Sequence, residues 1–172
     1  MSLTERIHAA SHLTGEFSLR SGAVATEYFD KYRFESDPRL LAEIATALEP
    51  LIPTATDALA GLELGGVPLA VALSLRSGLP CCFVRHKAKE HGTCRLAEGM
   101  DVAGLRLTIV EDVVTSGGQV LASATALRDL GAVVEHAVCV IDRQEGGSDA
   151  LRDRGIELRT LLTKTQLDEQ RS

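Results

Sequence analysis

The chain has 172 residues, of which 45% are hydrophobic, so it is long enough for one compact domain and too short for two ordinary ones. A formal net charge of −6 argues against broad binding to nucleic acid, and 3% aromatic residues leave no stacking platform for single strands. No apolar run approaches the ~18 residues of a membrane span, and MSLTERIHAA lacks the apolar core of a signal peptide, which predicts a soluble cytoplasmic protein.

The N-terminal residues, 1–36, are predicted to form a small cap within a single domain spanning residues 1–172. Short strands are expected at residues 16–19 and 26–34, on either side of Ser21-Gly22. A helix follows, because Asp37 is a good N-cap, Pro38 suits a first turn, and leucine, isoleucine and alanine recur on one face until Pro50.

Strands and helices alternate through the rest of the chain. This alternation predicts an α/β fold with a mainly parallel, twisted sheet flanked by helices. The C-terminal segment KTQLDEQRS is polar and is expected to fray or lie on the surface. The predicted elements are, in order, a strand at 58–64, a turn at 65–66, a helix at 67–77, a strand at 79–85, a strand at 105–111, a loop at 112–118, a helix at 119–130 and a strand at 133–142.

Residues 107–119, LTIVEDVVTSGGQ, carry the most chemical information. An apolar strand delivers Glu111 and Asp112 to the sheet edge where ligands bind in open α/β folds. The Thr-Ser-Gly-Gly turn that follows offers hydroxyls and backbone N–H groups at the positive end of a helix dipole, which suits a phosphate monoester. Two carboxylates would repel a phosphate but accept hydrogen bonds from paired ribose hydroxyls. The motif therefore predicts a sugar-phosphate site.

Two common nucleotide-binding motifs do not match this segment. A P-loop would need a Lys after its last glycine, and the three-glycine dinucleotide fingerprint is missing. Taken alone, Ser116-Gly117-Gly118 favours an ordinary strand-to-helix turn. The complete string of apolar, acidic, apolar and Thr-Ser-Gly-Gly residues is far more specific.

Basic residues are concentrated in one segment of this acidic chain. Their charge favours a polyanionic ligand, and a Lys suits a departing diphosphate because its ammonium is a compact point charge. A solvated surface hairpin with scattered charges is the alternative. The four cysteines show no paired metal-ligand spacing, so no protein metal site is expected. The basic residues are Arg85, His86, Lys87, Lys89, His91 and Arg95.

Residues 107–119 resemble the signature of the phosphoribosyltransferase family, a strand followed by two acidic residues, two apolar residues and a Thr- and Gly-rich turn. Residues 83–92, FVRHKAKEHG, look like the mobile catalytic loop of the orotate phosphoribosyltransferases. Residues 15–31, GEFSLRSGAVATEYFDK, are similar to the N-terminal substrate-binding segment of those enzymes. The matches run from about residue 15 to about residue 145, and they imply the type I phosphoribosyltransferase fold.

The resemblance implies roles for individual residues. Lys89 and Asp112 would be catalytic, with Lys89 stabilising the transition state. Arg143 has the chemistry to bind the orotate carboxylate, whereas Tyr28 and Phe29, as aromatic residues at a strand end, are also typical of a core. The residues implied to bind phosphoribosyl diphosphate are Arg85, His86, Lys89, His91, Glu111, Asp112, Val113, Val114, Thr115, Ser116, Gly117, Gly118 and Gln119. Those implied to bind orotate are Thr115, Arg143, Arg20, Tyr28 and Phe29.

The implied reaction transfers ribose 5-phosphate from phosphoribosyl diphosphate to orotate, giving orotidine 5-phosphate and diphosphate on the route to UMP. The resemblance also implies Mg²⁺ bound with the diphosphate donor and a homodimer whose loops reach into the neighbouring active sites. Two alternatives stay open. One is a phosphoribosyltransferase for another base, and the other is a non-catalytic, nucleotide-sensing regulator on the same fold.

Two positions depart from the family's pattern. Arg85 is followed by His86 where a Lys is usual, and an imidazole is only partly charged at neutral pH. Weaker diphosphate binding or a stronger pH dependence is therefore expected. Gly65 stands where a Lys is common, next to the glycine of the turn that holds the diphosphate.

Overall fold

The computed structural model describes residues 1–18, 22–87 and 96–171. Within them a six-stranded sheet has the order β5-β4-β3-β6-β7-β8, and neighbouring strands are parallel except for the pair β4 and β5. This arrangement confirms the predicted α/β class with a mainly parallel sheet. The strands are β3 (Ala58–Leu62), β4 (Cys81–Val84), β5 (Ala97–Glu98), β6 (Arg106–Val114), β7 (Val133–Asp142) and β8 (Glu157–Thr163).

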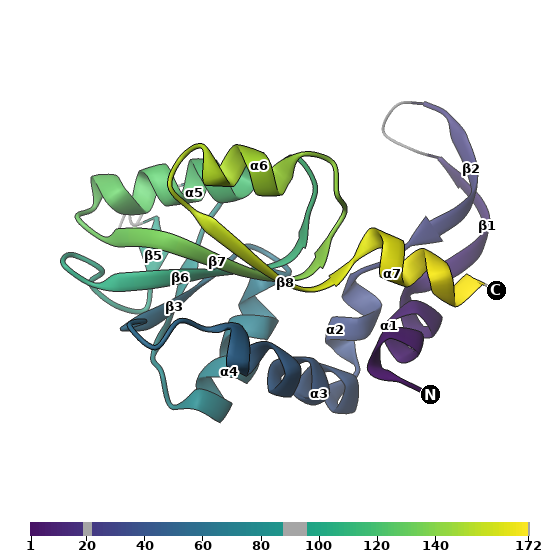
Figure 1. Ribbon diagram of the computed structural model, residues 1–172, viewed down its shortest axis with the longest axis horizontal. Coiled ribbons are helices and arrows are strands. Elements are labelled where there is room, and N and C mark those ends of the chain that lie inside the picture. The colour runs from purple at the N-terminus through teal and green to yellow at the C-terminus, as the bar shows by residue number, and fades with distance from the viewer. Residues whose placement is uncertain (19–21, 88–95, 172) are drawn as a thin grey trace.

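Helices cover both faces of the sheet (Figure 1). Helices α3 (Pro38–Leu48) and α4 (Gly66–Ser77) lie on one face, and α5 (Gly118–Asp129) and α6 (Gly147–Arg152) lie on the other. Adjacent residues of a strand point to opposite faces, so Ile109 packs with the α5 side and Val110 with the α3 side, both fully buried. The sheet is apolar on both faces because each face is covered.

The cap forms one end of the molecule (Figure 1). Ile7 and Phe34 of the cap are fully buried in the same apolar cluster as Leu69 of α4. The C-terminal helix lies beside α1, so both ends of the chain meet here. The remaining elements are α1 (Leu3–Ser11), the antiparallel hairpin β1 (His12–Ser18) and β2 (Val24–Phe29), α2 (Tyr32–Ser36), η1 (Glu49–Leu51), α7 (Lys164–Asp168) and η2 (Glu169–Arg171).

Three local predictions were wrong. The strand expected at 26–34 ends at Phe29, and Tyr32 begins a helix instead. The strand expected to end at Glu111 continues to Val114, because Val113 and Val114 pair with the end of β7. The C-terminal segment folds as α7, where Leu167 is only 6% exposed. The helix of residues 38–48 and the strand of residues 133–142 are confirmed. No described helix combines the length and apolarity that crossing a bilayer requires.

Candidate active site

The turn after β6 forms a small hollow of about 70 Å³. Glu111 lines it on the strand side, and Gln119 and Val120 line it from the first turn of α5. The first N–H groups of a helix have no intrahelical partner, and they carry the positive end of the helix dipole. Thr115 and Ser116, which carry hydroxyl groups, also line the hollow. The hollow can therefore hold a phosphate, as the sequence predicts.

Gly117 is needed for this geometry. Its φ angle of +78° lies in the left-handed region, and a Cβ there would come within 3.2 Å of the Gly147 carbonyl oxygen. A larger residue would push the turn away from α6. We call the hollow lined by residues 113–120 the phosphate cradle. Its shape thus depends on the packing of α5 against α6 as well as on its own residues.

The two acidic residues of β6 have different surroundings, because adjacent side chains of a strand point to opposite faces. Glu111 lines the cradle hollow and is 7% exposed. Asp112 is fully buried on the other side, and its Oδ2 occupies the position that a Cβ of Gly65 would need, 1.7 Å away. The usual Lys therefore has no room at position 65 unless Asp112 moves.

Lys31 from the cap reaches Asp112 across 81 positions of sequence. Its Nζ donates a hydrogen bond of 3.0 Å to Asp112 Oδ1 and lies 2.7 Å from Oδ2. Burial alone would lower the pKa of Lys31, but the hydrogen bond and charge of Asp112 outweigh it, so the pKa is raised and the ammonium stays charged. The ion pair joins the cap to the end of β6.

Glu35 completes a buried group of carboxyls. It is 6% exposed. Its Oε1 lies 2.8 Å from the position that a Cβ of Gly65 would take, so it approaches the same point as Asp112 Oδ2. Burial, with the nearby charge of Asp112, raises the pKa of Glu35 to about 9 and that of Glu111 also to about 9. Both carboxyls are therefore protonated at neutral pH, and Lys31 balances Asp112.

The basic segment begins beside the turn that leads into α4. The backbone N–H of Glu63 bonds Val84 O at 2.9 Å, and the N–H of His86 bonds Glu63 Oε2 at 2.7 Å. Arg85 Nε is buried and has no hydrogen-bond partner among the described residues. The structure thus brings residues 85–87 next to the N-terminus of α4. Lys89 and His91 lie outside the described residues.

Of the residues implied for orotate, Phe29 and Arg143 line one hollow of about 80 Å³, together with Lys164 of α7. Arg143 lies next to the cradle, because its N–H bonds Val114 O at 2.9 Å, just before Thr115. Tyr28 points to the other face of the hairpin, where its ring packs 5.4 Å from Phe17. Arg20 lies outside the described residues.

Three comparisons bear on this geometry. A family model described as a phosphoribosyl transferase domain matches residues 33–161. A protein from Nocardioides sp. named orotate phosphoribosyltransferase is 54% identical over 170 residues, covering 99% of this chain and 95% of that protein. The crystal structure of Mycobacterium tuberculosis orotate phosphoribosyltransferase with Fe(III) dicitrate has a TM-score of 0.87 at 33% identity, and that of the enzyme with phosphoribosyl diphosphate has 0.82 at 29%, each covering 96% of both chains.

The chain belongs to the phosphoribosyltransferase family, among its orotate phosphoribosyltransferases. The family resemblance found in the sequence is therefore confirmed. The roles of single residues stay predictions, although the structure places Glu111, residues 113–119, Arg85, His86 and Arg143 around the carboxyl ends of β4, β6 and β7, where ligands bind in open α/β sheets.

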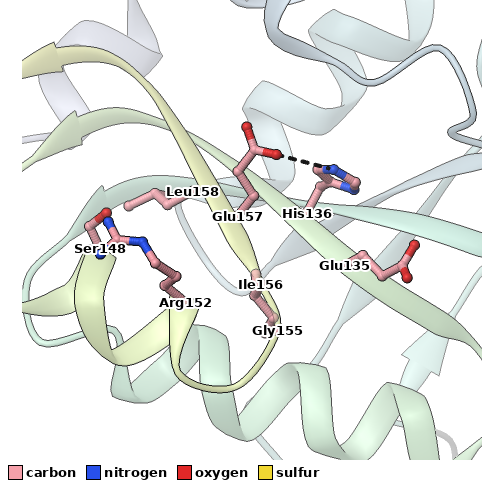
Figure 2. A pocket seen from close by; sticks show the side chains of 8 residues that line it. All are labelled: Glu135, His136, Ser148, Arg152, Gly155, Ile156, Glu157 and Leu158. Carbon is pink, nitrogen blue, oxygen red and sulfur yellow. Dashed lines mark ion pairs between the residues drawn. The ribbon is translucent and has the colours of Figure 1, made fainter.

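A cavity of about 560 Å³ lies away from this phosphoribosyltransferase site (Figure 2). Glu135, His136 and Glu157 line it at the amino ends of β7 and β8, opposite the strand ends that carry the cradle. His136 Nε2 lies 3.5 Å from Glu157 Oε2 (Figure 2). Its size does not make it the active site, since the cradle and Arg143 lie at the other edge of the sheet.

Sequence reasoning missed several residues that lie beside the candidate site. Lys31 ends the segment matched to the family, and Glu35 follows it by one helical turn, but nothing in the spacing places either beside Asp112. Gln144 was missed as well. It has a φ of +58°, unusual for a residue with a side chain, and its Oε1 accepts bonds from Thr165 N at 3.0 Å and Thr165 Oγ1 at 2.7 Å.

Proposed function

We propose that this chain transfers ribose 5-phosphate from phosphoribosyl diphosphate to orotate N1, releasing diphosphate and forming orotidine 5-phosphate for UMP synthesis. The observation that carries this proposal is the cradle at the end of β6 with Arg143 hydrogen-bonded beside it. The cradle suits the 5-phosphate of the donor, and a guanidinium suits the carboxylate of the acceptor. The names of the similar proteins agree with this pairing.

Glu111 lies where a ribose held by the cradle would present its hydroxyls. A protonated carboxyl both donates and accepts a hydrogen bond, and the pKa of Glu111, about 9, gives it that capacity at neutral pH. Glu111 thereby binds the sugar without placing a carboxylate charge beside the negatively charged phosphate.

The reaction needs stabilisation of the departing diphosphate, since the ribose becomes oxocarbenium-like as the bond breaks. Positioning of both partners and neutralisation of the leaving group supply most of the catalysis. Lys89 is our candidate for the second task, with Arg85, His86 and His91. Closure of their loop would exclude water and limit hydrolysis of the donor.

Magnesium, when bound with the donor, neutralises charge on the diphosphate. The residues present fit a metal that is carried by phosphate oxygens. Asp112 is paired with Lys31, and the pKa values of Glu35 and Glu111, about 9, keep both carboxyls protonated. These oxygens are therefore poor ligands for Mg²⁺, and we expect no closed protein cage for it.

We also propose a cytoplasmic homodimer. Apolar side chains are exposed in a row along α4 and its preceding turn, with Leu64 63%, Val71 37% and Leu75 85% exposed. Residues four apart on a helix share a face, so Val71 and Leu75 offer one apolar surface to a second copy. This surface lies on the same helix whose N-terminus borders the basic segment, which supports active sites shared between subunits.

The test of function is a spectrophotometric assay of orotate consumption with phosphoribosyl diphosphate and Mg²⁺, run beside adenine, hypoxanthine and uracil. We expect turnover of orotate alone. Turnover of another base instead would leave the donor site standing and overturn the base assignment. Donor binding with no turnover of any base would favour the nucleotide-sensing regulator.

A further inference from the structure

Lys31 forms a cluster with the three carboxyl side chains of Asp112, Glu35 and Glu111, and it is the member of this cluster that faces solvent. Its side chain is 35% exposed, whereas Asp112 beneath it is 0% exposed. Glu35 and Glu111 are almost as deeply buried, at 6% and 7%. A ligand that approaches this group from solvent therefore meets an ammonium before it meets a carboxylate.

The charge of the group agrees with this picture. Burial and the nearby charge of Asp112 raise the pKa values of Glu35 and Glu111 to about 9, and Lys31 is the cation in contact with Asp112. Three ionised carboxylates would repel a polyanion strongly at such short range. With two of them protonated, the repulsion is largely removed and the cation can act on an incoming anion.

The position of Lys31 complements the cradle. The donor carries anionic groups at both ends of its ribose, a monophosphate at one and a diphosphate at the other, so it needs two anion-binding places. The cradle follows β6, while Lys31 contacts the Asp112 carboxylate that lies against Gly65. Gly65 precedes α4 and follows the neighbouring strand β3. Adjacent strands are about 4.8 Å apart, a spacing that suits the two ends of one sugar.

Position 65 does not supply the second cation, because it is a glycine. A side chain there would need Asp112 to move, since Asp112 Oδ2 is 1.7 Å from the Cβ position. Lys31 reaches the Asp112 carboxylate from the cap. Its Nζ lies 2.7 Å from Asp112 Oδ2 and 3.0 Å from Oδ1. The cap thus delivers a positive charge where the turn cannot.

We propose that Lys31 is a substrate-binding residue that contacts the diphosphate of the donor, and that Asp112 and Glu35 position it. This inference rests on the proposed function. On binding, the Lys31 ammonium shares its hydrogen bonds between Asp112 and the diphosphate. Asp112 then acts through Lys31, in addition to any contact with the ribose.

The experiment measures binding by isothermal titration calorimetry, with Mg²⁺ present, for phosphoribosyl diphosphate, diphosphate and ribose 5-phosphate separately. We expect Lys31→Ala to weaken phosphoribosyl diphosphate and diphosphate by roughly 10- to 100-fold, as for a lost charge-assisted hydrogen bond. Ribose 5-phosphate should change less than about threefold, because the cradle is intact. Arg33→Ala, which removes an exposed cation from the helix that Lys31 precedes, is the matched control.

Lys31→Ala leaves Asp112 buried without its partner and could unfold the cap. Lys31→Gln keeps a hydrogen-bond donor and removes only the charge, so it is the second variant. The same selective loss of diphosphate binding is expected. Equal weakening of all three ligands would show a purely structural role, and unchanged diphosphate binding in Lys31→Gln would also overturn the proposal. Because turnover is not measured, failure to react with orotate leaves this test intact.

Discussion

Glu35 is a carboxyl whose buried setting makes stability depend on pH. Its pKa is raised from 4.5 to about 9, mainly by burial and then by the charge of Asp112. Between these two pH values the folded chain keeps a proton that the unfolded chain has lost. Stability from this group is therefore fully present below pH 4.5 and declines as the pH rises towards 9.

Glu35→Gln should remove that decline, because an amide resembles the protonated carboxyl. We expect the variant to be more stable than the unmodified chain at pH 8.5 by about 1 kcal/mol or more, a shift in Tm of roughly 2–4 °C, and to lose this advantage at pH 5. Chemical unfolding at both pH values measures it. Glu43→Gln is the control, since the hydrogen bond from Arg6 lowers the pKa of half-exposed Glu43 and puts its titration below this window.

His86 gives a second prediction at the residue scale. Its backbone is fixed to Glu63 by a bond of 2.7 Å, so its ring begins the basic segment beside the N-terminus of α4. We expect His86→Lys, which places a permanent charge at this position, to lower the KM for phosphoribosyl diphosphate by roughly two- to fivefold, in the range of one partly exposed ion pair. Steady-state kinetics with the donor varied measures this change.

The matched control is His136→Gln, at the opposite end of the strands. Its KM for phosphoribosyl diphosphate should equal that of the unmodified chain. If His86→Lys leaves this KM unchanged, the residue at position 86 does not tune diphosphate binding.

The loop between β7 and α6 illustrates how one element positions another. Gln144 holds a left-handed backbone conformation one residue after Arg143, and its N–H bonds Asp142 Oδ1 at 2.8 Å. Its side chain bonds the first turn of α7 through Thr165. Such strain persists only where the surroundings hold it, so α7 fixes the direction in which Arg143 leaves the sheet.

Gln144→Ala should therefore raise the KM for orotate by roughly tenfold, because a displaced positioning group is costly, and leave the KM for phosphoribosyl diphosphate within about twofold. Steady-state kinetics with each substrate varied separates the two. Gln166→Ala disturbs the cap of α7 at Thr163 but leaves Gln144 in place, and it should change neither value strongly. A similar rise for both substrates would point to general loosening of the site.

Elements could be predicted where local signals agree with packing. Asp37-Pro38 and one apolar face specify α3, and the continuous apolar run of β7 marks a strand buried on both sides. The predicted end of β6 was wrong because pairing with β7, a long-range contact, extends it through Val114. Capping boxes at Ser2-Glu5 and Thr163-Gln166 are local signals for α1 and α7 that the sequence does contain.

At the scale of the whole molecule, the sequence predicts the cradle but not how the cap packs against the end of β6. The cradle is one continuous segment, so its chemistry is readable from neighbouring residues. The contact of Lys31 and Glu35 with Asp112 joins segments about 80 positions apart, and it depends on how α2 packs against α3 and beside the turn that leads into α4. The structure alone shows that Gly65 and Lys31 both lie against the Asp112 carboxylate.

The proposed homodimer gives the prediction that belongs to the assembly. Leu75 is 85% exposed on α4, so Leu75→Arg should cost the folded monomer little, within about 0.5 kcal/mol. An arginine charge buried against a second copy without a partner costs much free energy, so we expect the variant to be monomeric by sedimentation velocity. If loops are shared between sites, its activity should also fall roughly tenfold or more.

Leu130→Arg changes an exposed leucine at the end of α5, on the opposite face of the sheet, and this control should stay dimeric and active. A dimeric Leu75→Arg would place the interface elsewhere, and a fully active monomer would show that each subunit completes its own site.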